Sequence, residues 1–512
     1  MLIASLLIAG AASAQTPEDA LRYSFYPQSS TGRISAIGGA MGSVGGDITA
    51  TFVNPAGLGF FHNSDAAITP GFMLQQNHFN YRDTKSTNNN NAFAFGPTGV
   101  ILGGRFNAYT KKNKFAALSL AITQAANFNS HAAFTGLNNY SSYAEQLAEE
   151  FASSGQSIDA VLNTMSPLPY TAAPALWNYL IDTQRIGSGY KVRAITENLL
   201  DAGFALRQEY DRTTKGGLYE AAIGIGGDLG NKWMVGGSVG IPLVYYNSIT
   251  TVTETDTAAV SKYGFTHYTF TDEMTTKGIG GNLKLGVIYR PEEYFRIGLA
   301  IHSPSLIRQE ETRATSLSVP AYNGIGDTLT RSGSFTEGND LKNTYSQLTP
   351  WKAILSASYV FREVENVNRQ RGFITADIEY VNHKGSRFYT DEASAFDNSG
   401  YFKSLNKVIK NEYRGTFNAK IGGEIKFNPI MARLGFAYYG NPYKKEYVIK
   451  ADKMQFTGGL GYRNKGMYFD IAYVYTKNRD AQFPYRLSDR ANTFAVNDGR
   501  YGNVVATVGF KL

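Results

Sequence analysis

Cysteine is absent from the 512 residues of this chain. Its absence excludes a disulfide framework and removes thiolate metal sites and thiol nucleophiles together. Long apolar runs are also missing, because after residue 14 no stretch reaches the ~20 residues that a membrane-spanning helix requires. The chain therefore cannot cross a membrane by helices, and packing and hydrogen bonding must stabilise its fold.

Residues that carry catalysis or bind cofactors are scarce. The histidines are dispersed, none belongs to a His-Glu-x-x-His pair, and no phosphate-binding loop occurs. The glycine runs at 224–227 and 236–240 lie in predicted strands, where packing explains them better than nucleotide binding does. We expect no enzymatic activity, no catalytic residue, no metal site and no cofactor. The six histidines are His62, His78, His131, His267, His302 and His383.

The chain is moderately basic, with 49 Lys and Arg against 42 Asp and Glu and a formal net charge of +7. The basic residues are scattered singly and form neither a block nor a helical stripe, which excludes nucleic acid as a partner. We expect them to solvate the surface, with some attraction to anionic lipid headgroups.

The N-terminus resembles an export signal. Residues 1–14 carry no charge and end in Ala12-Ser13-Ala14, the small-x-small pattern that signal peptidase cleaves. The basic residues that normally precede such a stretch are missing. We expect an exported chain with a signal peptide over 1–14 and a mature N-terminus near Gln15.

Strict alternation of apolar and polar residues is the main structural signal. It is clearest in 454–463, where Met454, Phe456 and Leu460 alternate with polar or small residues, and it recurs in 467–476 and 503–512. Successive side chains of a β-strand point to opposite faces, so each segment has one side compatible with lipid. Similar segments lie near 66–82, 92–108, 113–127, 218–229, 232–247, 277–290, 294–306, 350–362, 371–383, 414–427 and 430–440.

These fourteen segments predict an all-β transmembrane antiparallel barrel. High glycine, tyrosine and phenylalanine contents and a slightly negative mean hydropathy fit a chain in which only alternate residues meet lipid. Charged residues interrupt two segments and are tolerable only in a polar lumen. They are Asp377, Glu379, Lys420, Glu424 and Lys426.

The connections alternate between short and long, as in bacterial outer-membrane barrels with short periplasmic turns and long external loops. The predicted short turns are Thr110–Asn113, Gly230-Asn231, Arg290–Glu293, Asn428-Pro429 and Arg463–Gly466. On the opposite side, among the long loops, a shorter Asn-rich loop is predicted at Asn88–Asn91. The predicted long loops are 128–217, 248–276, 307–345, 384–413, 441–453 and 479–500. A soluble sandwich or propeller also alternates, but it has shorter strands and no such asymmetry of loops.

Residues 15–65 precede the first strand and lack the pattern of a strand. Gly38, Gly39, Gly42, Gly45 and Gly46 allow tight turns and close backbone contacts. Apolar residues between them argue against a flexible leader. We expect a compact element folded inside the lumen, followed by the barrel over 66–512.

The sequence resembles the FadL/TodX-like outer-membrane transport proteins, which carry long-chain fatty acids and other hydrophobic compounds. The match rests on residues 38–40, 45–47, Asn54-Pro55-Ala56-Gly57-Leu58-Gly59, 434–438 and 459–463 with 470–473. The resemblance implies that 15–65 is a hatch, that Asn54, Pro55, Ala56 and Gly57 are its gate element facing a wall opening, and that external loops capture a ligand released laterally. The chain departs from the usual pattern by ending in Lys511-Leu512 without a terminal aromatic residue.

Two prolines mark predicted irregularities of the wall. Pro97 lies between Gly96 and Gly99, and Pro242 lies in another strand. Proline cannot donate a hydrogen bond to a ladder, so each can open a local gap or mark a simple bulge.

Part of the loop at 128–217 is predicted to be helical. Tyr143, Leu147 and Phe151 recur at helical spacing, and Leu162, Leu176 and Tyr179 continue an apolar surface. An external loop with that much apolar surface must bury it. A lid over the barrel mouth, a groove for a hydrophobic ligand and a partner protein all remain open.

Two functions fit this sequence. The first is transport of a hydrophobic small molecule across the outer membrane, with that molecule, lipid or lipopolysaccharide as partner. The second is that of PorV-like relatives, which serve as a shuttle or accessory subunit in a secretion or assembly complex with other outer-membrane proteins.

Overall fold

The computed structural model describes residues 16–105, 115–230, 232–258, 264–320, 328–361, 371–390, 399–444 and 450–511. Within them the chain forms a closed antiparallel barrel of 14 strands, which confirms the predicted fold. The first wall strand closes the barrel by pairing with the last, from Asp65↔Lys511 to Ile68↔Val508. The predicted signal peptide, 1–14, lies outside the described residues.

The wall strands are long, and short breaks divide several of them into two labelled parts. In chain order they are β1 (Asp65–Ile68) continued by β2 (Pro70–Tyr81), β3 (Thr84–Phe95) continued by β4 (Thr98–Arg105), β5 (Phe115–Asn127) continued by β6 (Ser130–Asn138), β9 (Leu206–Asp228), β10 (Trp233–Asp256), β11 (His267–Glu292), β12 (Phe295–His302) continued by β13 (Leu306–Val319), β15 (Leu341–Leu348) continued by β16 (Lys352–Phe361), β17 (Gly372–Asn382) continued by β18 (Arg387–Thr390), β19 (Gly415–Lys426), β20 (Ile430–Tyr439), β21 (Lys453–Asn464), β22 (Met467–Gln482) and β23 (Ala495–Lys511).

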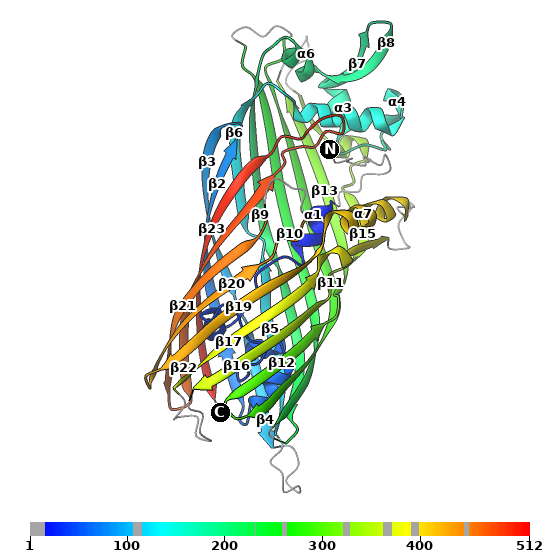
Figure 1. Cartoon of the computed structure of the whole chain (residues 1–512). Helices are drawn as coiled ribbons and strands as arrows, with labels where there is room; N and C mark the ends of the chain where they lie inside the picture. The colour runs from blue at the N-terminus through cyan, green and yellow to red at the C-terminus, as the bar shows by residue number, and fades with distance from the viewer. Residues whose placement is uncertain are drawn as a thin grey trace.

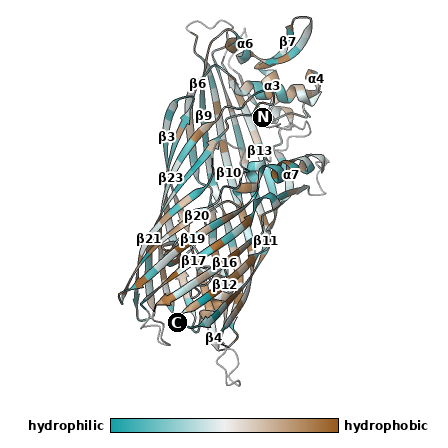
Figure 2. Cartoon of the chain, viewed as in Figure 1, coloured by the Kyte–Doolittle hydropathy of each residue, from teal (hydrophilic) through white to brown (hydrophobic). Residues whose placement is uncertain are grey.

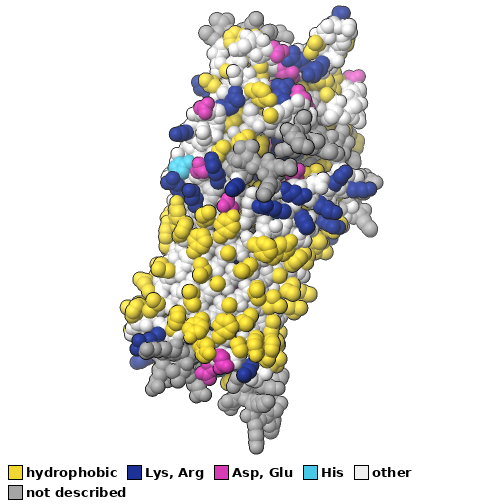
Figure 3. Space-filling model, viewed as in Figure 1, with side chains coloured by type: hydrophobic (Ala, Val, Ile, Leu, Met, Phe, Trp, Pro, Cys, Tyr) yellow, Lys and Arg dark blue, Asp and Glu magenta, His cyan; other side chains and the backbone are white. Residues whose placement is uncertain are grey.

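The wall strands keep apolar side chains outside and polar ones inside, as the alternation predicts. In β21, Phe456 and Leu460 are 53% and 56% exposed, whereas Thr457 between them is 6% exposed. The outward residues merge into an apolar belt around the lower part of the barrel (Figures 2 and 3). Lipid is the solvent that such a belt requires, so this is the architecture of a bacterial outer-membrane protein.

The charged residues that interrupt the strands face the lumen, as predicted. Asp377 and Glu379 of β17 and Lys420 and Glu424 of β19 are all buried. Lys426, at the end of β19, is half-buried. Their charges are thereby kept away from lipid, where each would be costly.

Strand lengths make the barrel uneven in height. β9, β10 and β11 have 23, 24 and 26 residues, far more than the ~10 that cross a membrane. β20 has only 10. Figure 1 shows a tall wall that includes β9 and β10 and a low rim at β19 and β20, beside which lies the helix α7 (Ser399–Glu412).

Two predicted connections are wrong in their bounds. The loop predicted at 128–217 is 139–205, because β6 and β9 continue above the belt and pair there. Asn88–Asn91 is no connection but part of β3, and the hairpin turns instead at Arg82 and Asp83, whose φ angles are 47° and 63°. The loops predicted at 248–276, 307–345, 384–413 and 479–500 are likewise shortened by strands that extend beyond their predicted ends, whereas the loop predicted at 441–453, between β20 and β21, is not shortened. The turn predicted at Thr110–Asn113 lies outside the described residues.

Residues 16–64, which we call the N-terminal segment, lie inside the barrel (Figure 1). Their buried apolar residues pack with the inward residues of the wall in one cluster that includes Ile37, Met41, Ala222 and Ile354. The elements of the segment are α1 (Pro17–Arg22), α2 (Gly32–Ser35), η1 (Ile48–Thr51) and η2 (Pro55–Phe60).

The loop 139–205 covers the external end of the barrel, and smaller elements lie in other loops. None of the described helices is long and apolar enough to cross a membrane. The elements of loop 139–205 are α3 (Tyr143–Ser154), α4 (Ile158–Val161), α5 (Ala172–Trp177), β7 (Ile181–Ile186), β8 (Gly189–Ala194) and α6 (Ile195–Asp201), and the others are β14 (Thr328–Arg331), η3 (Ser332–Phe335) and η5 (His383–Gly385).

Candidate functional site

Glycines of the barrel wall form a seat for the N-terminal segment. A Cβ atom at Gly286 of β11 would overlap the Asn54 side chain, and one at Gly236 of β10 would overlap the Pro55 carbonyl. At Gly226 of β9 a Cβ would lie 2.6 Å from the same carbonyl oxygen. Only glycine permits so close an approach. The packing role predicted for the glycine runs of β9 and β10 is thereby confirmed.

The glycine seat continues around the inner wall. Gly298 of β12 faces the backbone of Gly42, while Gly422 of β19 and Gly435 of β20 face the backbone of Ile37. The segment therefore follows the circumference of the lumen. Contact of these wall glycines with the segment was not predicted, although their signal was present as glycine at inward positions of alternating strands.

Asn54 ties two turns of the segment to each other and to the wall. Its Oδ1 accepts a hydrogen bond from the Ala56 N–H at 3.1 Å. Its Nδ2 donates to the carbonyls of Gly42 at 2.6 Å and of Val287 in β11 at 3.5 Å. The Gly57 N–H donates to the Asn54 carbonyl at 2.9 Å. Asn54 is fully buried, so these partners replace the water that its amide loses.

The predicted gate residues Asn54–Gly57 thus lie against β9, β10 and β11. At this level the ladder between β10 and β11 is unbroken and includes Gly236↔Gly286 and Met234↔Ile288. The expectation that these residues face a wall opening is wrong, because a continuous ladder lies behind them.

Carboxylates of the wall hold other parts of the segment. Asp377 accepts hydrogen bonds from the N–H groups of Met41 and Gly42, each at 2.9 Å. Arg33 lies 3.5 Å from Glu424. Hydrogen bonds to charged groups contribute roughly 1.5–3 kcal/mol each, so displacing the whole segment would be costly.

Between β3 and β6 the wall is closed by side chains instead of a backbone ladder. β4 pairs with β5 along its whole length, but no ladder joins β3 to β6 in the part of the chain that the structure describes. Asn88 donates from Nδ2 to the Ala133 carbonyl at 2.6 Å and accepts the Ala133 N–H at 3.1 Å. Asn127 donates from Nδ2 to the Phe93 carbonyl at 3.0 Å. We call this boundary between β3 and β6 the seam.

Pro97 lies near the lower end of the seam. It separates β3 from β4, and next to it the Phe95 N–H donates to the Gln124 side chain at 3.3 Å. β5 shifts its register against β9 between Gln124 and Ala126. The irregularity predicted at Pro97 therefore coincides with the point where the backbone ladder ends.

A cavity of about 80 Å³ lies in the lumen between the segment and the wall. Its lining includes Tyr26 of the segment, Ala125 of β5 and Pro242 of β10. β10 keeps its register with β9 through Pro242↔Glu220, but its pairing with β11 is interrupted at Ile241 and Pro242, between Gly240↔Asn282 and Leu243↔Ile279, so the predicted irregularity lies on the β11 side. Sites for small molecules usually measure ~300–1,000 Å³, so a larger ligand requires the segment to move.

The cavity lining is part charged and part apolar. Lys284 forms an ion pair with Glu220, and Lys352 lies 3.8 Å from Glu379. The same lining includes the apolar side chains of Phe52, Leu218 and Ile307. The paired charges leave the apolar side chains as the surface available to a hydrophobic ligand.

The helix α3 lies over the barrel mouth and buries its apolar face there. Tyr143, Leu147 and Phe151 are buried in one cluster with Phe270 of β11 and Leu317 of β13. Of the three alternatives left open for this surface, the structure therefore shows a lid packed on its own barrel. We call loop 139–205 the lid.

The other predicted loop residues divide between the inside and outside of the lid. Leu176 of α5 belongs to the buried cluster and Leu162 packs against it. Tyr179 is instead 54% exposed, beside Trp177 at 57% and Met165 at 78%. The outer face of the lid therefore presents apolar side chains to the outside.

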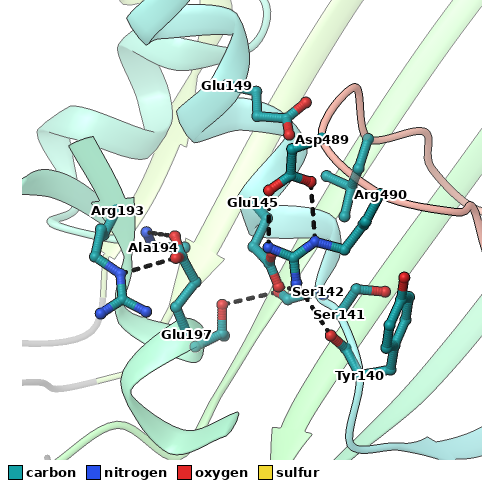
Figure 4. Close-up of polar contacts among 12 residues, drawn as sticks. Tyr140, Ser141, Ser142, Glu145, Glu149, Arg193, Ala194, Glu197, Asp489 and Arg490 are labelled. Carbon is teal, nitrogen blue, oxygen red and sulfur yellow. Dashed lines mark hydrogen bonds and ion pairs between the residues drawn. The ribbon is translucent and has the colours of Figure 1, made fainter. Parts of the chain in front are cut away.

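Polar contacts join the lid to the last loop, 483–494. Figure 4 shows Arg490 of that loop beside Glu145 of α3, at 3.2 Å, and beside Asp489, at 2.9 Å. Glu145 also accepts the Ser142 N–H at 2.9 Å and so caps the start of α3. Burial raises the pKa of Glu145 to about 7. The start of α3 is thus fastened by a carboxyl whose charge depends on pH.

No catalytic arrangement was found among the described residues. Residues 236–240 read Gly-Gly-Ser-Val-Gly, a formal match to the nucleophile motif of α/β-hydrolases. Ser238, however, lies within β10 and not at a turn between a strand and a helix, and its hydroxyl donates to the Thr51 carbonyl at 2.8 Å. No group of three or more histidine, aspartate or glutamate residues that could hold a metal occurs in the described ranges.

These features define a closed outer-membrane barrel whose lumen holds its own N-terminal segment. Two solved structures share the fold. A FadL homologue of Pseudomonas aeruginosa is 11% identical over 95% of this chain and 98% of its own, with a TM-score of 0.51. The toluene transporter TodX of Pseudomonas putida is 12% identical over 94% and 98%, with a TM-score of 0.50. At sequence identities this low, the likeness shows a common fold alone. No protein-family model and no curated protein matches the chain.

Proposed function

We propose that this chain transports hydrophobic small molecules across the outer membrane, with the N-terminal segment as a hatch. The observation that carries this proposal is that the cavity, the segment and the seam meet at one place. Ala125 lines the cavity, Gln124 beside it bonds to β3, and the Ser29 hydroxyl of the segment lies 3.0 Å from that of Thr123. The shared fold with a toluene transporter adds support.

The ligand class follows from the route. A molecule captured on the apolar outer face of the lid gains roughly 0.8 kcal/mol for each CH₂ group that it buries. Release into the bilayer at the lower end of the seam, beside the outward-facing Phe93, which is 65% exposed, spares it a return to water. A long-chain fatty acid or a compound like it meets both conditions, and the hatch excludes water-soluble molecules while it stays seated.

The seam is the part of the wall where opening costs least. Each side-chain hydrogen bond contributes about 1 kcal/mol net, so releasing Asn88, Asn127 and Gln124 costs a few kcal/mol. Parting a backbone ladder of comparable length would break more bonds and leave buried N–H and C=O groups without partners. Lateral release therefore takes place between β3 and β6.

Cross-linking tests this proposal, because the chain has no cysteine of its own. Cysteines at Asn88 and Ala133 are joined by a short reducible linker in intact cells. Uptake of radiolabelled oleate and toluene should then fall to the level of cells without the protein and return after reduction.

A matched pair joins two strands already held by a ladder. The hydroxyls of Thr253 in β10 and Thr269 in β11 lie 3.0 Å apart above the belt. Cross-linked cysteines at these positions should leave uptake unchanged. Unaltered uptake with the seam cross-linked would exclude lateral release there, and the absence of uptake by the unmodified protein would exclude transport of either probe.

One observation favours a second function, that of an interaction barrel within a secretion or assembly complex. Met165, Trp177 and Tyr190 on the outside of the lid are 78%, 57% and 75% exposed. Exposed apolar groups of this kind often mark contacts with other proteins. Stable copurification with another outer-membrane protein that is lost on replacing these three by serine, together with absent uptake, would favour this second function.

A further inference from the structure

The helix α7 lies beside the low rim of the barrel, where the external loops begin. It follows β18 and precedes β19 in the chain. Figure 3 shows a group of Lys and Arg side chains at this height, directly above the apolar belt and over the position of α7 in Figure 1. This group is the most strongly charged part of the face that the figure shows.

The two faces of α7 differ completely in chemistry. Leu405 and Ile409 are buried and pack in one cluster with Phe388 of β18. The opposite face carries exposed lysines at positions 403, 407 and 410, spaced four and three residues apart. Residues at this spacing lie on one side of a helix. The expectation that basic residues form no helical stripe is therefore wrong at α7. This helix lies in a loop, where the alternation of apolar and polar residues along strands does not predict it.

Neighbouring segments extend this positive surface. Lys384 of η5 and Arg387 of β18 are exposed. The Lys444 side chain donates to the Lys410 carbonyl at 3.1 Å, which places its ammonium group at the end of α7. Within the described residues, the ion pairs found involve none of these four side chains and neither of the other two lysines of α7. Like charges at this spacing destabilise a helix, so an anionic partner would stabilise the arrangement.

Aromatic residues fix the height of the stripe relative to the membrane. Trp351, Tyr380 and Phe417 form a chain of ring contacts with centroid separations of 5.4 and 5.1 Å. Phe417 is 65% exposed and lies five residues after the end of α7. Aromatic girdles of barrels occupy the level of the lipid headgroups. The lysines therefore lie at or just above the headgroup level on the external side.

We propose that α7 binds an outer-leaflet lipid whose headgroup carries two or more phosphates. The stripe from Lys403 to Lys410 covers seven residues, or about 10 Å at 1.5 Å per residue, which is longer than a single phosphate. The acyl chains lie below against the exposed side chains of Ile378, Phe417 and Ile421. Ammonium groups and phosphates attract one another most strongly where part of their water is excluded.

The proposal is tested with the full chain in nanodiscs and bisphosphorylated lipid A as the probe. Binding is measured by native mass spectrometry and by displacement of a fluorescent analogue. K403Q, K407Q and K410Q together should weaken binding by on the order of a hundredfold, because each lysine near a charged surface contributes roughly a fivefold factor. Lipid A without phosphates should bind the unmodified protein as weakly as bisphosphorylated lipid A binds the triple variant.

A control triple removes the same charge elsewhere. Arg185 and Lys191 lie in β7 and β8 of the lid, far above the low rim in Figure 1, and Arg331 lies in β14, which is bonded to the lid through Thr330 and Asn178; all three are exposed. R185Q, K191Q and R331Q should leave binding unchanged. Equal binding by both triples and the unmodified protein would overturn the proposal. Displacement by inorganic phosphate at the lipid's own concentration would also overturn it, since the site would then recognise a free anion.

This test is independent of transport, because it rests only on the barrel and its belt. The lysines are exposed, so the triple variant should keep the heat-modifiable migration of a folded barrel. Loss of that migration would remove the binding result as support, and K403Q alone, with a fivefold expected effect, would then decide the question.

Discussion

The barrel wall has two kinds of joint at the height of its external half. β10 and β11 are paired through their backbones from Trp233↔Tyr289 to Thr255↔His267, with one interruption at Ile241 and Pro242. β3 is joined to β6 by the side-chain amide of Asn88 and to the end of β5 by that of Asn127. Parting a ladder leaves many buried backbone groups unsatisfied, whereas an amide side chain turns away by rotation. The difference shows that the wall concentrates its weakest joint in one place and seats the N-terminal segment against its strongest.

The largest expected effect comes from disturbing the strong side. Gly236→Val would place a branched side chain against the Pro55 carbonyl, and overpacking of this kind costs about 3 kcal/mol or more when backbone must shift. The segment should lose its seat, so cells should admit a large hydrophilic antibiotic and the barrel should unfold at lower temperature.

Gly281→Val in β11 is the matched control, since no atom lies within 4 Å of a Cβ built at that glycine. It should change neither antibiotic sensitivity nor the unfolding temperature. An intact permeability barrier in Gly236→Val would show that the segment does not depend on this seat.

A smaller effect is expected at the weak side. Asn88→Ala removes two hydrogen bonds across the seam, a loss of about 2 kcal/mol at the usual net contribution. Amide hydrogen exchange in β3 and β6 should accelerate and oleate uptake should rise. Asn247→Ala is the control, because Asn247 bonds to Thr275 at 2.9 Å across an intact ladder. Equal acceleration in both variants would remove the distinction between the two joints.

The smallest expected effect concerns the lid above both joints. The pKa of Glu145 is raised by burial to about 7, from an ordinary value of 4.5. A carboxyl with a raised folded pKa is stabilising below its unfolded pKa, and this contribution is lost as pH rises through the folded value. After correction for the intrinsic pH dependence of amide exchange, the protection factors of α3 should therefore be higher at pH 4.5 than at pH 8. Glu145→Gln should remove this dependence, and an unchanged pH profile in that variant would assign it to another group.

The fold was predictable because lipid imposes a simple rule on every strand. Residues such as Phe456 and Thr457 alternate along β21 as they must when one face meets lipid and the other the lumen. The strand bounds were less predictable. Above the belt the alternation weakens. The predicted strands therefore omit β6 and the first half of β9, and the predicted loop 128–217 is longer than the observed lid.

The candidate site was predicted only in part. The Asn54-Pro55-Ala56 resemblance implies a gate element at a wall opening, whereas in the structure these residues lie on a continuous stretch of ladder. The seam was missed because asparagine runs are typical of turns. In the structure the Asn88 side-chain amide bonds to the backbone of Ala133, in place of the backbone hydrogen bonds that a ladder would supply. Ala133 lies in another strand, 45 residues away, so the local sequence around Asn88 does not predict this contact.

The amino-acid sequence by itself determined the lipid-facing side of each strand, the number of strands and the closure of the barrel, because these follow from local alternation and from the need to leave no edge in lipid. Tertiary structure decided which strands part above the belt, where the N-terminal segment rests and which lysines gather beside the low rim. These depend on contacts between residues hundreds of positions apart, such as Gly38 with Thr457 and Met41 with Asp377, and no local pattern records such contacts.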